Sequence, residues 1–181
     1  MSGHSHWSGI KHKKGAADAK KAAAFGKLCA AITAAAKTES NPDFNPRLRG
    51  AIDRARSVQV PNESIERAIN KAKDSTENLE ELIFEAYGPG GVAILMEVVT
   101  DNRNRSVSEI KKVLSDTAGK WADPGSVMWA FEKKSPTGGE WEAKFKQPLS
   151  PEDTEKLNEL IEELEDHQDI QRVHTNLDSL G

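Results

Sequence analysis

The residues of this sequence best suited to chemistry are cations and rings close to its start. Before residue 38, seven lysines stand against a single acid, Asp18. Lysines neutralise phosphates and release counterions, which gives a salt-sensitive affinity that does not depend on base sequence. An indole among them offers a flat face on which an unpaired base can stack. The alternative is a loose basic tail with an incidental aromatic ring. The residues predicted to contact nucleic acid here are His4, His6, Trp7, Lys11, His12, Lys13, Lys14, Lys20, Lys21 and Lys27.

Four arginines extend this prediction. Arg47 and Arg49 open a second basic segment, and Arg103 and Arg105 lie between an expected strand and an expected helix. A guanidinium group can clamp a phosphate with two parallel hydrogen bonds. For the second pair, internal pairing with Asp101 or Glu85 is an equally good interpretation.

The charge of the chain is divided by position. Residues 1–75 carry a net charge of +7 and residues 76–181 carry −11, which together give −4. A basic segment is attracted to phosphate backbones, whereas an acidic one is repelled by them and favours solubility. The alternative is that the asymmetry serves solubility alone.

Other chemistries find little support. Metal-ligand spacings such as CxxC or HExxH are absent, so we expect no metal and no cofactor. Cys29 falls on the apolar side of an expected helix, where packing is the simpler role than nucleophilic attack. We find no nucleophile–base pair, phosphate-binding loop or carboxylate dyad, which argues against an enzyme and identifies no small-molecule substrate. A lone cysteine, no apolar run of about 20 residues and no signal-peptide pattern predict a cytoplasmic protein without membrane contact.

The elements that must position these residues fall into two groups. Apolar spacing predicts helices over 16–37, from Pro46 and from Pro61, which form a three-helix bundle in a basic domain of residues 1–78. Residues 79–181 alternate strand and helix signals, with helices opening at Ser106 and Ser150. The predicted class is therefore α+β: a three-helix bundle followed by a ferredoxin-like β-α-β-β-α-β domain with an extra strand. The strands are expected at 82–86 (the extra one), 92–100, 126–131, 141–145 and 170–175.

Six sequence blocks occur in one order across residues 3–131. They are Gly3–Trp7 with Ile10–Lys13 and Asp18–Lys20; Asn45–Arg49; Pro61 with Ile65–Ile69; Glu85–Gly91; Thr100–Arg105; and Gly125–Val127. In these blocks the chain resembles the YebC/PmpR family, which includes the mitochondrial translational activators of cytochrome c oxidase. Two departures stand out: His6 replaces the usual lysine before the tryptophan, and the small domain expected after Phe131 is missing.

The resemblance implies a non-enzymatic regulator of gene expression that contacts DNA or RNA through its basic helices, as a transcriptional regulatory protein. A ribosome-associated translation factor that binds ribosomal RNA and relieves stalling is the alternative that it also implies. A protein–protein adaptor that uses the acidic sheet is a third hypothesis.

Overall fold

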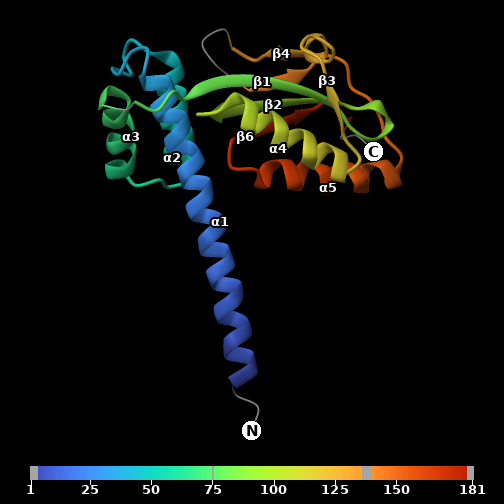
Figure 1. Ribbon diagram of the computed structural model, residues 1–181, viewed down its shortest axis with the longest axis horizontal. Coiled ribbons are helices and arrows are strands. Elements are labelled where there is room, and N and C mark those ends of the chain that lie inside the picture. The colour runs from blue at the N-terminus through green and yellow to red at the C-terminus, as the bar shows by residue number, and fades with distance from the viewer. Residues whose placement is uncertain (1–3, 75, 136–139, 179–181) are drawn as a thin grey trace.

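The structure is a computed structural model that describes residues 4–74, 76–135 and 140–178, with side-chain surroundings from residue 15 onward. Three helices come first, α1 (His4–Ala36), α2 (Pro46–Ser57) and α3 (Asn62–Asp74). A mixed region of sheet and helix follows and lies beside them (Figure 1). Among the described residues, no helix is both long and apolar enough to cross a membrane.

The helix starts follow local sequence chemistry. Asn45 caps α2, because its side-chain oxygen accepts the Leu48 amide at 3.1 Å and Pro46 occupies the first helical position. Pro61 directly precedes α3, as the sequence predicts. The expected three-helix arrangement is confirmed.

The three helices share a thin, alanine-rich core. Ile32, Leu48, Ala55 and Ile65 are buried where the helices meet. Phe25, Leu28 and Cys29 lie half-buried at the edge of this core, on the helix face that their spacing predicts. Burial makes the pKa of the Cys29 thiol higher than its usual value, which disfavours the nucleophilic thiolate.

Only the second half of α1 belongs to this core. Every residue from 15 to 24 is exposed, and the first half-buried side chain is that of Phe25. In Figure 1 the first half of α1 projects away from the rest of the molecule toward the N-terminus. The part of α1 from Phe25 onward is therefore packed on the other helices, and residues 15–24 project from the molecule.

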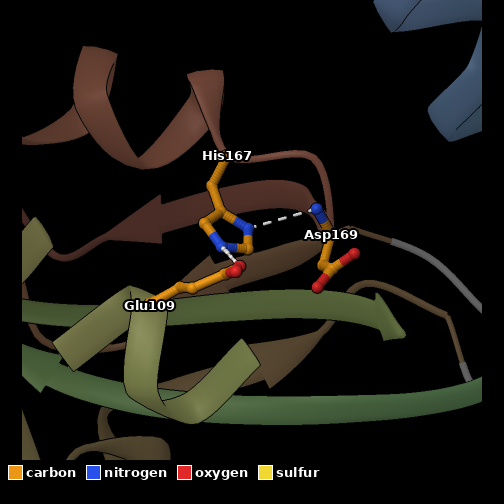
Figure 2. Close-up of side chains that lie close together, drawn as sticks. All are labelled: Glu109, His167 and Asp169. Carbon is orange, nitrogen blue, oxygen red and sulfur yellow. Dashed lines mark hydrogen bonds and ion pairs between the residues drawn. The ribbon is translucent and has the colours of Figure 1, made fainter. Parts of the chain in front are cut away.

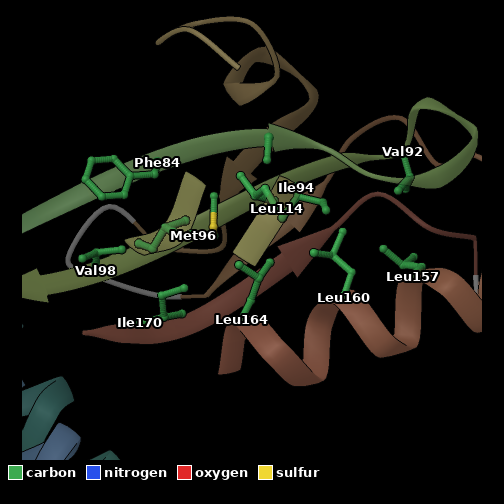
Figure 3. Close-up of a cluster of buried hydrophobic side chains, with 12 residues drawn as sticks. Phe84, Val92, Ile94, Met96, Val98, Leu114, Leu157, Leu160, Leu164 and Ile170 are labelled. Carbon is green, nitrogen blue, oxygen red and sulfur yellow. The ribbon is translucent and has the colours of Figure 1, made fainter. Parts of the chain in front are cut away.

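The main sheet has four antiparallel strands in the order β3-β1-β2-β6. Successive residues of β1 and β2 point to opposite faces of the sheet, and each face packs against a different layer. One face packs against α4 and α5, as the side chains of Phe84, Met96, Leu160 and Leu164 show in Figure 3. The elements are β1 (Glu80–Tyr87), β2 (Ala93–Thr100), α4 (Arg103–Asp116), β3 (Lys120–Ala122), α5 (Pro151–Asp166) and β6 (Ile170–Thr175).

The opposite face carries a two-stranded hairpin, β4 (Phe131–Lys133) with β5 (Trp141–Ala143). Leu95, Val127 and Phe131 are buried between this hairpin and the sheet. Short 3₁₀ turns at Pro89–Gly91 and Met128–Ala130 precede β2 and β4. The two strands pair antiparallel, with Phe131 opposite Ala143 and Lys133 opposite Trp141.

The predicted class, three helices and then an α+β region with a four-stranded antiparallel sheet and two helices on one face, is confirmed. The membership of the sheet differs from the expectation. Residues 80–87 form an interior strand and not an extra one, because β1 pairs with both β2 and β3. The residues expected to form strands at 126–131 and 141–145 instead supply the separate hairpin, with a 3₁₀ turn at 128–130.

One helix start also differs. Ser106 was the predicted start of α4, but Asn102 is the cap, and its side chain accepts the Arg105 amide at 3.1 Å. The Ser106 hydroxyl lies one turn inside the helix, where it contacts Thr100 and Asp169, each at 2.6 Å. Contacts with the end of β2 and with the residue before β6 therefore occupy the Ser106 hydroxyl, which the capping-box pattern assigns to the start of the helix.

Candidate nucleic-acid interface

The predicted basic residues of α1 lie along its projecting half. Lys20 and Lys21 are exposed, and the Lys21 ammonium lies 5.6 Å from the centre of the Phe25 ring. The backbone of residues 4–14 is helical. The side chains of His4, His6, Trp7, Lys11, His12, Lys13 and Lys14 lie outside the described part, so their contact with nucleic acid stays a prediction.

Lys27, unlike Lys20 and Lys21, is half-buried and connects α1 to the end of α5. Its ammonium donates to the Glu165 carbonyl, and Gln171 of β6 donates to the Lys27 carbonyl at 2.9 Å. Burial lowers the pKa of Lys27, and the charges of Asp166 and Glu165 oppose that shift without cancelling it. Lys27 is therefore committed to an internal junction.

The two arginines at the start of α2 are also engaged. Arg47 pairs with Glu81 at the start of β1, and Arg49 donates to the carbonyls of Pro42 and Asp43 at 2.8 and 3.2 Å. Both side chains belong to exposed residues. Arg49 holds the turn before α2, Arg47 contacts the start of β1, and both residues remain exposed.

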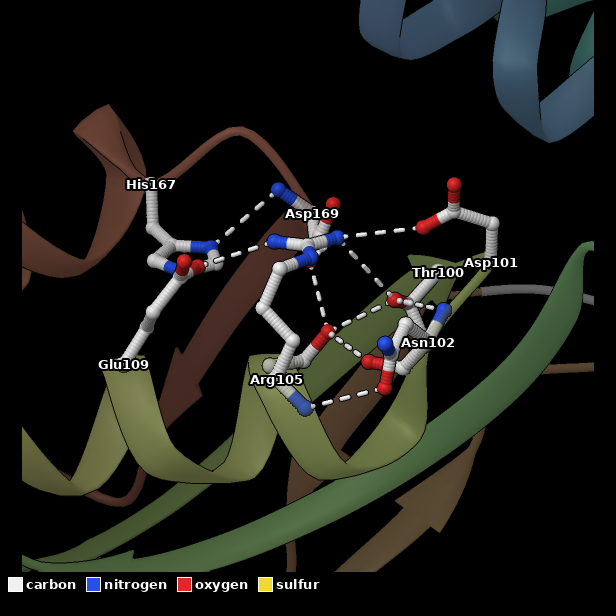
Figure 4. Close-up of polar contacts among 8 residues, drawn as sticks. Thr100, Asp101, Asn102, Arg105, Glu109, His167 and Asp169 are labelled. Atoms are coloured by element: carbon white, nitrogen blue, oxygen red, sulfur yellow. Dashed lines mark hydrogen bonds and ion pairs between the residues drawn. The ribbon is translucent and has the colours of Figure 1, made fainter.

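Arg103 and Arg105 differ in their surroundings. Arg103 is exposed on the first turn of α4. Figure 4 shows Arg105 reaching between carboxylates from three segments of the chain: Asp101 at 3.2 Å, Glu109 at 2.9 Å and Asp169 at 2.9 Å. Burial alone would lower the pKa of Arg105, but the bond to Asp101 and the nearby charges of Asp169 and Glu109 raise it. Of the two alternatives for Arg105, internal pairing describes its contacts.

The same cluster has the residue types of a metal site. Ligand atoms of Glu109, His167 and Asp169 lie within 4.8 Å of one another (Figure 2). However, His167 Nε2 is already 2.9 Å from Glu109 Oε2, and the Asp169 amide donates to His167 Nδ1 at 3.1 Å. The Arg105 guanidinium contacts both carboxylates and supplies the positive charge that a cation would bring. The cluster is thus an internal network of ion pairs and hydrogen bonds.

Two adjoining clefts separate the helical region from the sheet. The first, of about 660 Å³, lies between α1 and β6 and includes Lys21, Lys27 and Arg54. The second, of about 860 Å³, lies between α2, the sheet and the hairpin and includes Arg47, Arg54 and Trp141. The structure therefore brings Lys21, Lys27 and Arg47 around one shared residue, Arg54. Arg103 and Arg105 line neither cleft.

Arg54 and the residues opposite it on β6 were missed as site residues. Arg172 and His174 of β6 bind the Glu97 carboxylate of β2, at 3.0 Å and 2.6 Å. Burial by itself would raise the pKa of Glu97, but the hydrogen bond from His174 and the charge of Arg172 outweigh it, and the pKa lies below its usual value. Arg54 belongs to a basic helix with no distinguishing motif in the sequence, so only the position of α2 across the clefts from the sheet could single it out.

Comparison with known proteins identifies relatives across the chain. Residues 5–75 match the family description "TACO1/YebC protein N-terminal domain", and residues 79–138 match "TACO1/YebC second and third domain". A probable transcriptional regulatory protein of Trichlorobacter lovleyi is 51% identical over 137 residues, which cover 74% of this chain and 56% of that protein. One of Citrifermentans bemidjiense is 42% identical over 190 residues, covering 100% of this chain and 77% of that protein.

A solved structure agrees with these matches. The crystal structure of a conserved hypothetical protein from Aquifex aeolicus superposes with a TM-score of 0.78 at 28% sequence identity, covering 89% of this chain and 91% of that one. The chain spans just over half the length of some relatives and about three quarters of others. On these matches in sequence and fold, the chain belongs to the TACO1/YebC family.

Proposed function

We propose that this chain is a non-enzymatic, cytoplasmic regulator of gene expression that binds nucleic acid through the basic faces of α1 and α2. In this proposal residues 1–78 form the binding domain, and residues 79–181 form the acidic domain that carries it. The relatives of Trichlorobacter lovleyi and Citrifermentans bemidjiense are named probable transcriptional regulatory proteins, which supports a role in transcription.

The observation that carries the proposal is the projecting half of α1. Its described residues 15–24 are all exposed and include Lys20 and Lys21 with a single acid, Asp18. A rod of this kind is free to lie along a phosphate backbone, whereas the acidic sheet region is repelled from it. Lysines position a nucleic acid more than they select a base sequence. The proposed contact is therefore mainly electrostatic.

The first test measures binding of the full chain to a fluorescent single-stranded oligonucleotide and to a duplex. About six phosphate contacts predict a loss of roughly 10³-fold in affinity between 50 and 200 mM salt. Replacing Lys11, Lys13, Lys14, Lys20 and Lys21 with Gln should flatten this salt dependence and weaken binding to both ligands. The melting temperature should stay unchanged, because Lys20 and Lys21 lie outside the core.

The matched control removes lysines from the acidic region. Lys111, Lys112, Lys120, Lys144 and Lys146 are exposed in the acidic region, and their replacement with Gln removes the same amount of positive charge as the α1 variant. Binding that falls equally in both variants would show that net charge alone matters and would contradict a contact through α1. A flat salt profile in the wild-type chain would favour the adaptor hypothesis instead.

A second test identifies the natural ligand. Crosslinking in cells, followed by sequencing of the bound nucleic acid, separates the transcriptional role from the ribosomal one. Promoter DNA among the recovered fragments would support transcriptional regulation. Ribosomal RNA would support the translation factor, with the same α1 contact.

A further inference from the structure

Arg54 is a half-buried cation that lines both clefts. It projects from α2 into the junction of both clefts, and its guanidinium forms no hydrogen bond or ion pair with the described part of the chain. Glu97 and Glu140 act on it only as more distant charges, and Arg172 repels it. Burial lowers the pKa of Arg54 from a value far above neutrality. A half-buried cation without a direct partner is costly, and an anion that entered the clefts would remove that cost.

The acids near Arg54 are largely neutralised by other groups. Glu97 is held by Arg172 and His174, and Glu140 lies 4.0 Å from Lys134. The first cleft is lined by four lysines and arginines against two glutamates, and the second by four against three. Both clefts are thus net positive in a chain whose total charge is −4. An anion approaching Arg54 meets attraction in both.

The second cleft also offers apolar, flat surface next to this charge. Ile83 and Val99 lie in its lining with the indole of Trp141, whose ring is 5.1 Å from the Lys133 ammonium. Gln171 lines both clefts, and its Oε1 atom is buried without a hydrogen-bond partner. A base carries an aromatic face and amino donors, so it suits these two features. The cleft volumes fall in the range of small-ligand sites.

We propose that Arg54 binds the phosphate group of a nucleotide whose base enters the cleft beside Trp141. The guanidinium suits a phosphate because its planar fork donates two parallel hydrogen bonds. A nucleotide of a bound single strand and a free mononucleotide share this chemistry. If the nucleotide belongs to a bound single strand, the inference rests on the proposed function. In that case one nucleotide of the strand enters the cleft, in addition to the surface contact of the strand with α1.

The first arm of the test uses adenosine monophosphate and inorganic phosphate as probes of the full chain. Nitrogen-15 spectra that resolve arginine Nε–H groups should show Arg54 shifting on titration with the mononucleotide. Arg56, which lies exposed on the same helix, is the internal reference. If the Arg54 signal stays still, or moves no more than that of Arg56, the phosphate site is disproved.

The second arm compares Arg54→Gln with Arg56→Gln in binding to a single-stranded oligonucleotide. Arg54→Gln should weaken binding by about 10-fold and lower the slope of log K against log salt by about 1. Arg56→Gln should have a clearly smaller effect. Equal effects would disprove a role for Arg54 with the strand. If Arg54→Gln fails to fold, the titration of the wild-type chain decides the result, and Arg54→Lys tests whether charge without the fork is enough.

The two arms separate this inference from the proposed function. A mononucleotide response of Arg54 in a chain that ignores oligonucleotides would support the site as one for free nucleotides and reject the strand source. Oligonucleotide binding that depends on the α1 lysines but not on Arg54 would leave the proposed function standing and reject the strand source. If Arg54 also failed to respond to the mononucleotide, the inference would be overturned. A response to inorganic phosphate as strong as to adenosine monophosphate would reject the base pocket beside Trp141.

Discussion

Two glutamates of neighbouring strands show how single carboxylates organise this fold. Glu85 of β1 is 2% exposed and accepts the backbone amides of Gly125, Val127 and Met128 at 2.6, 2.7 and 2.9 Å. It thereby fixes the loop that leads into β4. Glu97 of β2 instead receives side chains from β6 and fixes the wall of the first cleft. One carboxylate fixes a loop, and the other fixes two side chains that line a cleft.

Glu85→Gln should lower the free energy of unfolding by about 2 kcal/mol, because a carboxamide has a single accepting oxygen and at least one of the three amides loses its partner. Urea unfolding followed by circular dichroism measures this loss. Glu80→Gln, an exposed change on the same strand, should stay within about 0.5 kcal/mol of wild type. Similar losses in both variants would show that the Glu85 contacts contribute little.

The pKa of Glu97 gives a pH-dependent prediction. The pKa of Glu97 is lower in the folded chain than in the unfolded chain, where it is about 4.3. The ionised Glu97 carboxylate therefore stabilises the fold fully above about pH 4.3, and this stabilisation is lost as the pH falls through the pKa of the folded chain. Glu97→Gln should therefore cost about 2 kcal/mol at pH 7 and progressively less below about pH 4.3. Unfolding titrations at several pH values test this. A difference between wild type and variant that stays constant with pH would contradict the assignment.

At the scale of elements, α1 combines two kinds of helix. From Phe25 onward its residues pack on α2 and α3, so tertiary contacts stabilise that half. Residues 15–24 are exposed, so this part of the helix depends on its own propensity, which the alanines at 16, 17, 19 and 22–24 supply. Helix stability in the free half should then control binding without affecting the core.

Replacing Ala22 and Ala23 with Gly should destabilise the free half by about 1 kcal/mol per residue. The expected result is weaker oligonucleotide binding with an unchanged melting temperature. Ala35→Gly, in the packed half, should lower the melting temperature because Ala35 is buried among the three helices. Binding that is indifferent to the Ala22 and Ala23 changes would show that an ordered rod is not needed.

At the scale of the whole molecule, what the sequence predicts is mostly local. Asn45, Pro46 and Ser150 mark helix starts, because a cap acts within one turn of its own helix. The pairing of β1 with β3 and the network around Arg105 join segments far apart in the chain, and local patterns do not carry that information. Ser106 illustrates the difference, since its local pattern indicates a cap and a tertiary contact with Asp169 determines its position.

The same division holds for the candidate site. Charge counting is enough to predict the lysines of α1 as contact residues, because the proposed contact needs only exposure and positive charge. Arg54 becomes distinctive because it lies across a cleft from β6, and this arrangement depends on contacts such as Arg47 with Glu81 and Gln171 with Lys27. The amino-acid composition and the local sequence pattern do not predict this arrangement of distant segments.

Because α1 is fixed near Lys27, a small rotation at that point would move the N-terminal end of the helix over a larger distance. At 1.5 Å per residue, the part of the helix before Phe25 is about 30 Å long. A tilt of about 10° at the anchor would sweep its far end through about 5 Å, more than the 3.4 Å rise of one base pair. Small adjustments at the junction would thus let the tip follow backbones of different curvature, while groups beside the pivot, Arg54 among them, would hardly move.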